Sequence, residues 1–388
     1  MRCLDAAVRE LSLLNHIYAA NAALPPRVTI PPGDDMGAVT VGGPTPSPRS
    51  GGESPGGRGE GAQSTATRGI TNPLPTLGET VLVTVDQIAD GVHFRLSTTP
   101  LSRIARKAIT RNLSDVAAMG AVPVAAVVAG CLPRGFGEMR ANELFDHMRQ
   151  VAASYDCPLI GGDISMWDHA LLLSVTVLAE PRGVAPILRS GAQSGDIICV
   201  TGALGGSLEE IALQFPEGAP RPTCAPLLGY IHHLDFEPRL TVARQLASHP
   251  DIRPHCMIDL SDGLGKDLAH LCLPLPSSHL PAPSSHLPLP SALSAELWLD
   301  KLPISRGAVQ ASQRDGKPPW QHALGDGEDY ELCFTVSPAK AARLPREIDG
   351  VPIARIGFMK PRGETLITLV HPDGSRQPMG EQGWEHHD

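Results

Sequence analysis

Apolar and polar residues alternate along this chain with two periods, one typical of strands and one typical of helices. Short apolar runs such as TVLVTVDQ and PVAAVVAG predict strands, and the spacing in FGEMRANELFDHMRQVAASYD predicts an amphipathic helix. The alternation is typical of an α/β or α+β fold. Strands are predicted for residues 80–87, 123–130, 157–163, 169–180, 195–202, 327–336 and 351–359. Helices are predicted for residues 102–120, 136–156, 208–215 and 238–248, and a strand running into a helix for residues 256–271.

The length of the chain predicts two domains. A chain of 388 residues exceeds one typical domain, and its hydrophobic fraction of 42% is sufficient for two sizeable cores. Prolines and glycines cluster over residues 181–195, which predicts the boundary there. We therefore expect an N-terminal domain over residues 1–185 and a C-terminal α/β domain over residues 186–388.

Two segments differ from the rest in composition. Residues 41–79 are rich in Gly, Pro, Ser and Thr and lack apolar periodicity, which predicts a disordered insert. No predicted strand leads into these glycines and no helix follows them, so they do not indicate a phosphate-binding loop. Residues 274–292 contain PSSHLP twice, and their proline density favours extended chain. We expect His279 and His286 of this repeat to be solvent-exposed rather than metal ligands.

The overall charge and the cysteines narrow the class of protein. Lys and Arg number 32 against 41 Asp and Glu, giving a formal net charge of -9. An acidic chain is a poor candidate for binding nucleic acid or an anionic membrane. The 8 cysteines are scattered and form no C-x-x-C pair, as expected of free thiols in a reducing compartment. The N-terminal MRCLDAAVRELSLLNHIY predicts an amphipathic helix and not a signal peptide, and the longest apolar stretch is too short to span a membrane. We expect a cytoplasmic protein.

The positions of the acidic residues carry the most chemical information. Some of these acidic residues follow Pro-Pro-Gly or Gly-Gly, and others end a predicted strand or stand beside a serine. Nearly all of them therefore fall near the end of a predicted strand or helix. Ligands of α/β proteins bind at such strand ends and turns. Each residue alone could be a helix N-cap or a turn residue, but the set as a whole is poorly explained in that way. The set is Asp34, Asp35, Asp86, Asp115, Asp163, Asp259, Asp262, Glu328 and Asp329.

Converging carboxylates without Cys or His partners are typical of a site for hard cations. Mg2+ takes oxygen ligands and is held by a few carboxylates together with substrate phosphates. The sequence contains no EF-hand loop, no H-E-x-x-H zinc motif, no P-loop and no protein-kinase signature. If the protein uses ATP, we expect it to do so through metal ions and backbone contacts.

Seven segments, in order, resemble the thiamine-monophosphate kinase family of the aminoimidazole-ribonucleotide-synthetase superfamily. They are GDDMGAV, TVDQIADGVHF, NLSDVAAMGAVP, LIGGDIS, RSGAQSGDIICVTG, CMIDLSDGLGKDL and ALGDGEDYELCFTV, and the closing GWEHH resembles the family's ending. The resemblance covers most of the chain outside the two inserts. It implies a two-domain fold whose N-terminal sheet domain pairs in a homodimer. It also implies transfer of the γ-phosphoryl group of ATP to thiamine monophosphate, giving thiamine diphosphate, with several Mg2+ ions and no acid or base residue.

The resemblance also implies roles for individual residues, carried over motif by motif. ATP is expected to contact Gly162, Asp163, Arg189 and Ser261. Thiamine monophosphate is expected to contact His93, Glu328 and Trp384. Each of these three has another reading, because Glu328 could brace a turn, His93 could be structural and Trp384 could pack on a core. Mg2+ is expected on Asp35, Thr84, Val85, Asp86, Asp115, Asp163, Asp259 and Asp262, with Val85 limited to its backbone.

Several positions depart from the family's pattern. Val85 replaces Thr or Ser, and Ile164 replaces the Thr after Gly-Gly-Asp. Asp326 stands where the family has Gly, while Gly206 and Glu210 stand where it tends to have Asp and Gly. None of these changes removes a carboxylate ligand. Two alternatives remain open: another ATP-using enzyme of the same superfamily, and a non-catalytic nucleotide-binding homologue.

Overall fold

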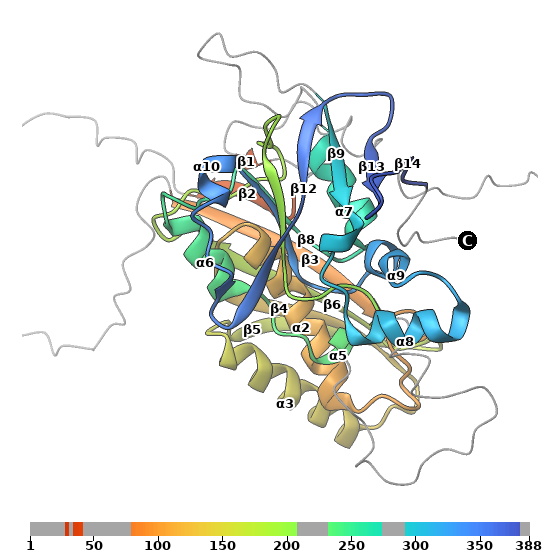
Figure 1. The fold of residues 1–388 in the computed structure, drawn as a ribbon. Coiled ribbons are helices and arrows are strands. Elements are labelled where there is room, and N and C mark those ends of the chain that lie inside the picture. Colours follow the sequence, from red (N-terminus) through yellow and green to blue (C-terminus); the bar gives the residue numbers. More distant parts are fainter. Residues whose placement is uncertain (1–27, 31–33, 42–78, 208–231, 274–291, 381–388) are drawn as a thin grey trace, which may run out of the picture.

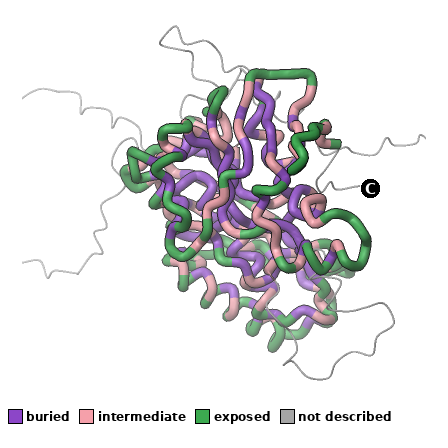
Figure 2. Tube along the Cα trace, in the orientation of Figure 1, coloured by how far each residue is buried: buried purple, intermediate pink, exposed green. Residues whose placement is uncertain are grey.

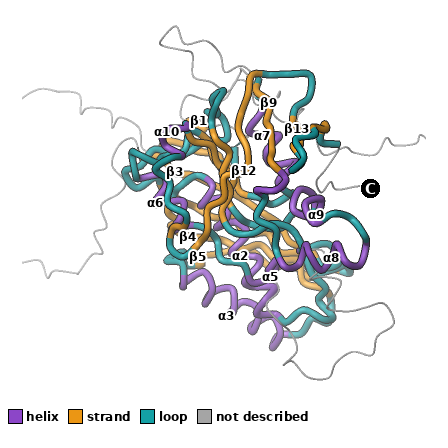
Figure 3. The backbone as a smooth tube through the Cα atoms, in the orientation of Figure 1, coloured by secondary structure: helices purple, strands orange, loops and turns teal. Residues whose placement is uncertain are grey.

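A computed structural model describes residues 28–30, 34–41, 79–207, 232–273 and 292–380 of the chain. Strands occupy the middle of the molecule and helices lie around them (Figures 1 and 3). The buried residues follow the strands and the inner sides of the helices (Figure 2). Among the described residues, the search for a helix long and apolar enough to cross a membrane found none.

The first sheet has six strands in the order β1-β2-β3-β6-β4-β5. All neighbouring strands are antiparallel except β4 and β5, which run parallel. Buried and less buried residues alternate along β6, which places one face of this sheet against a core and leaves the other uncovered in the single chain. The strands are β1 (Val28–Ile30), β2 (Gly37–Val41), β3 (Glu79–Ala89), β4 (Val122–Pro133), β5 (Leu159–Trp167) and β6 (Leu172–Glu180).

Helix α2 (Leu101–Ala118) is the central helix of the molecule, with α3 (Glu138–Ser154) on its outer side. It packs against β3 and β6 of the first sheet and also against α5, α6 and β8 of the C-terminal part. Residues on nearly every side of α2 are therefore buried, including the polar Lys107, Asn112 and Ser114. Buried polar groups need partners, and those of α2 form part of the site described below.

The second sheet has eight strands, with the path β14-β13-β9-β12-β7-β10-β8 and β11 paired to β12. Only β9 and β13 run parallel. Apolar residues on its two faces belong to separate clusters, with Ile198 and Val200 of β7 in one and Cys199 in the other. The strands are β7 (Ile197–Thr201), β8 (Cys256–Asp259), β9 (Leu293–Trp298), β10 (Leu332–Val336), β11 (Glu347–Ile348), β12 (Val351–Pro361), β13 (Ile367–Val370) and β14 (Arg376–Pro378).

Short helices accompany the second sheet. Leu246 of α6 packs in the cluster of Cys199, and Leu268 of α7 and Leu324 of α9 pack in the other cluster. The helices are α5 (His232–Asp235), α6 (Leu240–Ser248), α7 (Leu264–Cys272), η3 (Leu299–Lys301), α8 (Arg306–Asp315), α9 (Pro319–Gly325) and α10 (Pro338–Ala341).

The predicted mixture of strands and helices is confirmed, with corrections at individual elements. Asp86 does not end its strand, because β3 continues to Ala89. The strand predicted to end at Asp163 continues, because β5 runs through Gly161 and Gly162 to Trp167. A side chain at residue 162 would meet the Val128 carbonyl oxygen of β4 at 1.9 Å, so glycine there allows the two parallel strands to approach. The strand predicted for 327–336 begins only at Leu332, because the residues before it form a loop.

Several predictions concern residues outside the described ranges. These are the N-terminal helix, nearly all of the insert at 41–79 and of the repeat at 274–292, and the helix at 208–215. The division into domains at residues 185 and 186 stays a prediction, and β6 and β7 lie on either side of it in different sheets. Six cysteines fall within the described ranges and all are free thiols, five of them buried.

Candidate active site

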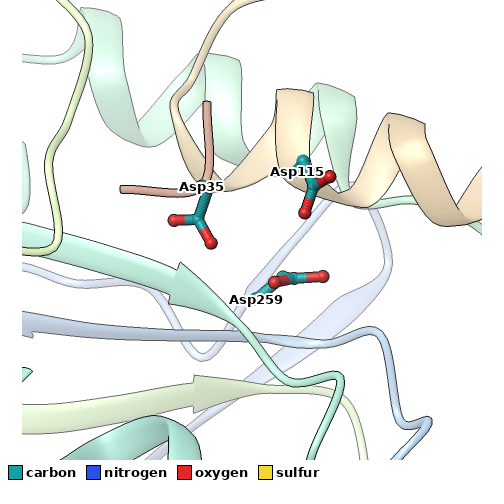
Figure 4. Close-up of side chains that lie close together, drawn as sticks. All are labelled: Asp35, Asp115 and Asp259. Atoms are coloured by element: carbon teal, nitrogen blue, oxygen red, sulfur yellow. The ribbon is translucent and has the colours of Figure 1, made fainter. Parts of the chain in front are cut away.

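Three carboxylates from distant parts of the chain converge where the first sheet, α2 and the second sheet meet (Figure 4). Asp35 lies just before β2, Asp115 lies in the last turn of α2, and Asp259 ends β8. One oxygen from each lies within 4.8 Å of the other two. These are the only described His, Cys, Asp or Glu residues whose side chains gather closely enough to hold one metal ion. All three belong to the predicted metal ligands.

The three carboxylates repel one another in a region that water barely reaches. Burial, and then the charges of Asp86 and Asp259, raise the pKa of Asp115 well above its usual value. Burial and the charge of Asp35 raise the pKa of Asp259 to about 7. The Oδ2 atom of Asp35 is buried and has no hydrogen-bond partner. A cluster of this kind is stabilised by a cation, which removes the repulsion and coordinates the unpaired oxygen.

Two hydroxyl groups orient these carboxylates. Thr84 of β3 donates from Oγ1 to Asp115 Oδ2 at 2.5 Å. Ser114 of α2 donates from Oγ to Asp259 Oδ2 at 2.7 Å and so links the N-terminal part of the site to β8. Thr84 was predicted as a metal ligand; in this structure its hydroxyl hydrogen points to Asp115. Val85, the next residue of β3, points to the uncovered face and is 59% exposed.

Arg189 is paired with two adjacent aspartates of the site, Asp34 and Asp35. It donates from Nε to Asp35 Oδ1 at 3.1 Å, and its backbone N–H donates to Asp34 at 3.1 Å. Burial and the charge of Asp35 raise the pKa of Asp34 to about 7. Arg189 lies in the connection between β6 and β7, where the domain boundary was predicted. A predicted ATP contact and a predicted metal ligand therefore form one ion pair.

Asp86 lies beside the cluster and is already paired. Arg111 of α2 donates from Nε to its Oδ2 at 3.0 Å, and Asn112 Oδ1 accepts from its backbone N–H at 3.0 Å. The aspartate charge contributes to the raised pKa of Asp115, which shows that the two groups are close. Asp86 therefore stands at the edge of the cluster with a cation of the protein as its partner.

The turn after β8 carries the predicted residues Ser261 and Asp262. Asp262 pairs with Lys266 at 2.8 Å, one turn further along the chain. Its backbone N–H donates to Asp267 of α7 at 3.1 Å. Asp267 is buried, and burial followed by the charges of Asp262 and Asp259 raises its pKa well above the usual value. The hydrogen bond to Asp267 thereby holds this turn in place close to Asp259.

The predicted acceptor residue Glu328 lies in a loop that approaches α2. Lys107 of α2, which is fully buried, donates from Nζ to Glu328 Oε1 at 2.7 Å. The same ammonium group donates to the backbone carbonyl of His93 at 3.0 Å. The structure thus brings two predicted acceptor contacts, His93 and Glu328, to one lysine. His93 Nδ1 accepts from the Ala89 N–H at 3.1 Å, which places the proton of the neutral ring on Nε2.

Gly162 and Asp163 lie apart from the cluster within one chain. Their strand β5 is at the edge of the first sheet, and β4 and β6 separate it from β3. Asp163 pairs with Ala129, Ala129 with Ser174, and Ser174 with Gln87. Because directly paired residues share a face, Asp163 points to the same face as Gln87, opposite to Asp86. The expected contacts of Asp163 with a metal ion and with ATP therefore stay predictions, because within one chain Asp163 lies apart from the cluster.

Two residues that depart from the family pattern, Asp326 and Gly206, are in contact. Asp326 Oδ2 accepts from the backbone N–H of Gly206 at 2.9 Å, and His322 lies 3.1 Å from Asp326 Oδ1. Gly206 has φ +95°, and a side chain there would meet Ala308 N at 2.4 Å. The acidic side chain therefore reaches this contact from the 325–331 loop, because residue 206 has no room for one. Ile164 is exposed on β5, and Glu210 and Trp384 lie outside the described residues.

The polar residues of α2 that form hydrogen bonds with the site residues were not predicted from the sequence. These residues lie inside a predicted helix, where a polar side chain ordinarily faces solvent. Only the packing of α2 on both parts of the molecule buries them. A signal was present in the helical pattern, since polar residues occur around the whole circumference of an otherwise apolar helix. The missed residues are Lys107, Arg111, Asn112 and Ser114.

Comparison with known proteins defines the class. The family described as AIR synthase related protein, N-terminal domain, matches residues 72–180. The structure of AaThiL complexed with AMPPCP and TMP superposes with a TM-score of 0.69 at 22% identity, covering 100% of this chain and 99% of that one. The fold is therefore that of an AIR-synthase-related protein, as predicted.

The sequence relatives define the family within that class. The thiamine-monophosphate kinase of Rhodopirellula baltica is 38% identical over 272 residues, covering 70% of this chain and 73% of the relative. That of Escherichia coli K12 is 31% identical over 315 residues, covering 79% and 87%. The chain belongs to the thiamine-monophosphate kinase family, and the predicted family is confirmed.

Proposed function

We propose that this protein transfers the γ-phosphoryl group of ATP to thiamine monophosphate and produces thiamine diphosphate. The observation that supports this proposal most directly is the convergence of Asp35, Asp115 and Asp259 at the junction of the two sheets. Phosphoryl transfer depends mainly on positioning and charge neutralisation. The acceptor phosphate is already an anionic nucleophile at neutral pH, so the reaction needs no general base from the protein.

Asp35, Asp115 and Asp259 fit Mg2+ ions, with Asp86 and Asp262 at the edges of the site. Their donors are all oxygens, and the unpaired Oδ2 of Asp35 is suited to a cation. Mg2+ bound here would neutralise the phosphate charges of ATP and the acceptor. Thr84 and Ser114 hold the carboxylates of Asp115 and Asp259 in orientation.

Arg189 connects the carboxylate cluster to the nucleotide. In the structure its guanidinium pairs with Asp35. We propose that this guanidinium turns to the phosphates of ATP when Asp35 coordinates a cation. Ser261, at the turn after β8, would contact the nucleotide beside it. The acceptor would lie toward His93 and Glu328, with Trp384 completing its pocket.

A homodimer is part of the proposal. Large apolar side chains remain exposed on β3, β4 and β5, and an uncovered edge strand such as β5 is ordinarily protected. We propose that a second copy covers this region and that Asp163 acts at the partner's site. The exposed residues are Val85, Val124, Val127, Ile160, Ile164 and Met166, between 37% and 69% exposed.

Mixing two inactive variants tests this arrangement. Asp115→Asn and Asp163→Asn are each expected to be inactive. If Asp163 acts in the partner's site, mixed dimers contain one complete site of two, and random mixing restores up to about a quarter of wild-type activity. A mixture without activity, from proteins shown to exchange subunits, would place Asp163 in its own chain's site, whereas activity of Asp163→Asn by itself would place Asp163 outside the chemistry.

The activity itself is tested by incubating purified protein with ATP, MgCl2 and thiamine monophosphate and measuring thiamine diphosphate by chromatography. Unphosphorylated thiamine serves as the control acceptor and Asp115→Asn as the control protein. ATP binding without product would indicate a non-catalytic nucleotide-binding homologue. Hydrolysis of ATP without thiamine diphosphate would indicate another enzyme of the superfamily.

A further inference from the structure

A buried lysine and histidine lie behind Glu328, outside the carboxylate cluster. Lys107 Nζ is 2.7 Å from Glu328 Oε1 and 3.4 Å from His233 Nδ1, and this histidine nitrogen is 3.5 Å from Glu328 Oε2. The side chains of Lys107 and His233 are 0% and 2% exposed, whereas that of Glu328 is 21% exposed. Glu328 is therefore the member of this group that a ligand can reach.

The carboxylate of Glu328 is paired with one positive charge of the protein, that of Lys107. Burial, and then the charge of Lys107, lower the pKa of His233 well below its usual value, so this ring is neutral. Burial lowers the pKa of Lys107, and the charge of Glu328 opposes this shift. Lys107 balances the charge of Glu328, whereas the charge of Arg111 is balanced by Asp86. A cationic ligand would meet little net negative charge here.

The backbone around Glu328 is fixed. Glu328 adopts φ +54°, a conformation that a side-chain-bearing residue rarely takes, and its N–H donates to the Ser261 carbonyl at 2.7 Å. The next two residues anchor the loop: Gly205 N–H donates to Asp329 at 2.8 Å, and Tyr330 stacks on Phe236 with ring centroids 3.9 Å apart. The carboxylate is thus held in one orientation before any ligand binds.

Resting on the function proposed above, we propose that Lys107 is a positioning residue for acceptor specificity. It neutralises Glu328 and holds its carboxylate in place, so that the exposed part of this carboxylate faces the ligand as an oriented hydrogen-bond acceptor. The group recognised is the exocyclic amino group of the acceptor's aminopyrimidine ring, and not the positive charge of its thiazolium ring. Glu328 then selects the acceptor by hydrogen bonding, and its charge is balanced within the protein.

An acceptor analogue distinguishes recognition of the pyrimidine amino group from recognition of the thiazolium charge. In the analogue a carbonyl oxygen replaces the pyrimidine amino group, while the thiazolium charge and the phosphate remain. The wild-type protein is expected to use it with a kcat/KM lower by at least about tenfold, because a carbonyl oxygen opposes the carboxylate acceptor of Glu328. In Glu328→Leu this discrimination should disappear. Equal use of both acceptors by the wild-type protein would overturn the proposal.

A double-variant cycle tests Lys107. Lys107→Met and Glu328→Gln should each raise KM for thiamine monophosphate by about tenfold or more, since one leaves an unpaired carboxylate and the other an unpaired ammonium. The double variant restores neutrality and keeps a carbonyl acceptor, so its KM should lie closer to wild type than either single value. KM for ATP should stay within about twofold throughout. Lys301→Met, at an exposed lysine that pairs with Asp300, is the matched control.

The outcomes also separate this proposal from the function on which it rests. If the effects of the two single variants simply multiply in the double variant, or if KM for ATP rises equally, Lys107 is only structural. If Lys107→Met does not fold, as shown by its thermal transition, Lys107→Gln replaces it in both the single and the double variant. Wild-type protein that makes no thiamine diphosphate would refute the function itself, whereas the analogue and the cycle address only how the acceptor is recognised.

Discussion

The carboxylate cluster and the Lys107–Glu328 pair contact α2 about two turns apart, at Asp115 and Lys107, and they differ in how their charge is balanced. Asp35, Asp115 and Asp259 gather like charges and leave one buried oxygen without a partner. The Glu328 carboxylate meets a buried ammonium group at 2.7 Å. The cluster gathers negative charge that a cation would stabilise, whereas the pair is neutral within the protein. Under the two proposals made above, one end of the site would bind through metal ions and the other by directed hydrogen bonds.

The largest expected effect breaks the cluster. Asp115→Asn should lower kcat/KM by about a thousandfold, equivalent to about 4 kcal/mol, because it removes a ligand that several interactions orient. The metal-free variant should be no less stable than wild type, since the change also removes like-charge repulsion. Steady-state kinetics at saturating Mg2+ and thermal unfolding in EDTA measure the two effects. Turnover close to wild type would contradict the metal assignment; Asp300→Asn, at a surface ion pair, is the control.

The next effect concerns the loop that carries Glu328. Asp326→Ala should lower the free energy of unfolding by about 1–3 kcal/mol, because the Gly206 N–H loses its acceptor in a buried place. Asp326→Asn keeps an acceptor oxygen and should cost less. Urea unfolding of the three proteins gives the comparison. Equal stability of Asp326→Ala and wild type would show that the contact contributes nothing to this loop.

A smaller effect is expected from the hydroxyl that joins α2 to β8. Ser114→Ala removes the 2.7 Å hydrogen bond to Asp259 and leaves all carboxylates in place. We expect the Mg2+ concentration for half-maximal activity to rise several-fold, since residues that orient metal ligands typically contribute about 10–100-fold to metal affinity. A magnesium titration at fixed ATP measures it. An unchanged midpoint would mean that Asp259 needs no such support.

The last effect is on the dependence of stability on pH. The pKa values of Asp34 and Asp259 are raised to about 7 in the folded protein, above their unfolded value near 3.8. The folded state therefore binds more protons, and metal-free stability should fall as pH rises from about 4 to about 7. Excess Mg2+ should flatten this slope, because it replaces the protons. Melting temperatures across this range, with EDTA or MgCl2, provide the measurement; a slope of the opposite sign would contradict the burial of these carboxylates.

The family pattern identified the clustered carboxylates more reliably than the predicted elements did. The motifs pointed to Asp35, Asp115 and Asp259, and these three meet in space. The prediction that carboxylates mark element ends holds for Asp259 but not for Asp86, which lies within β3. Period and composition do not fix the last residue of a strand, because pairing with β6 extends β3 to Ala89.

The sequence by itself determined the family, the mixture of strands and helices and the identity of the clustered carboxylates, because these depend on local pattern and on motifs in order. Only the tertiary structure decided which charges are balanced. Lys107 is fully buried and paired with Glu328, 221 positions away, because α2 packs on both halves of the molecule. Asp163 turns away from Asp86 because four strands align in one register. Burial and pairing are properties of contacts between distant segments, and no local window of sequence contains both partners.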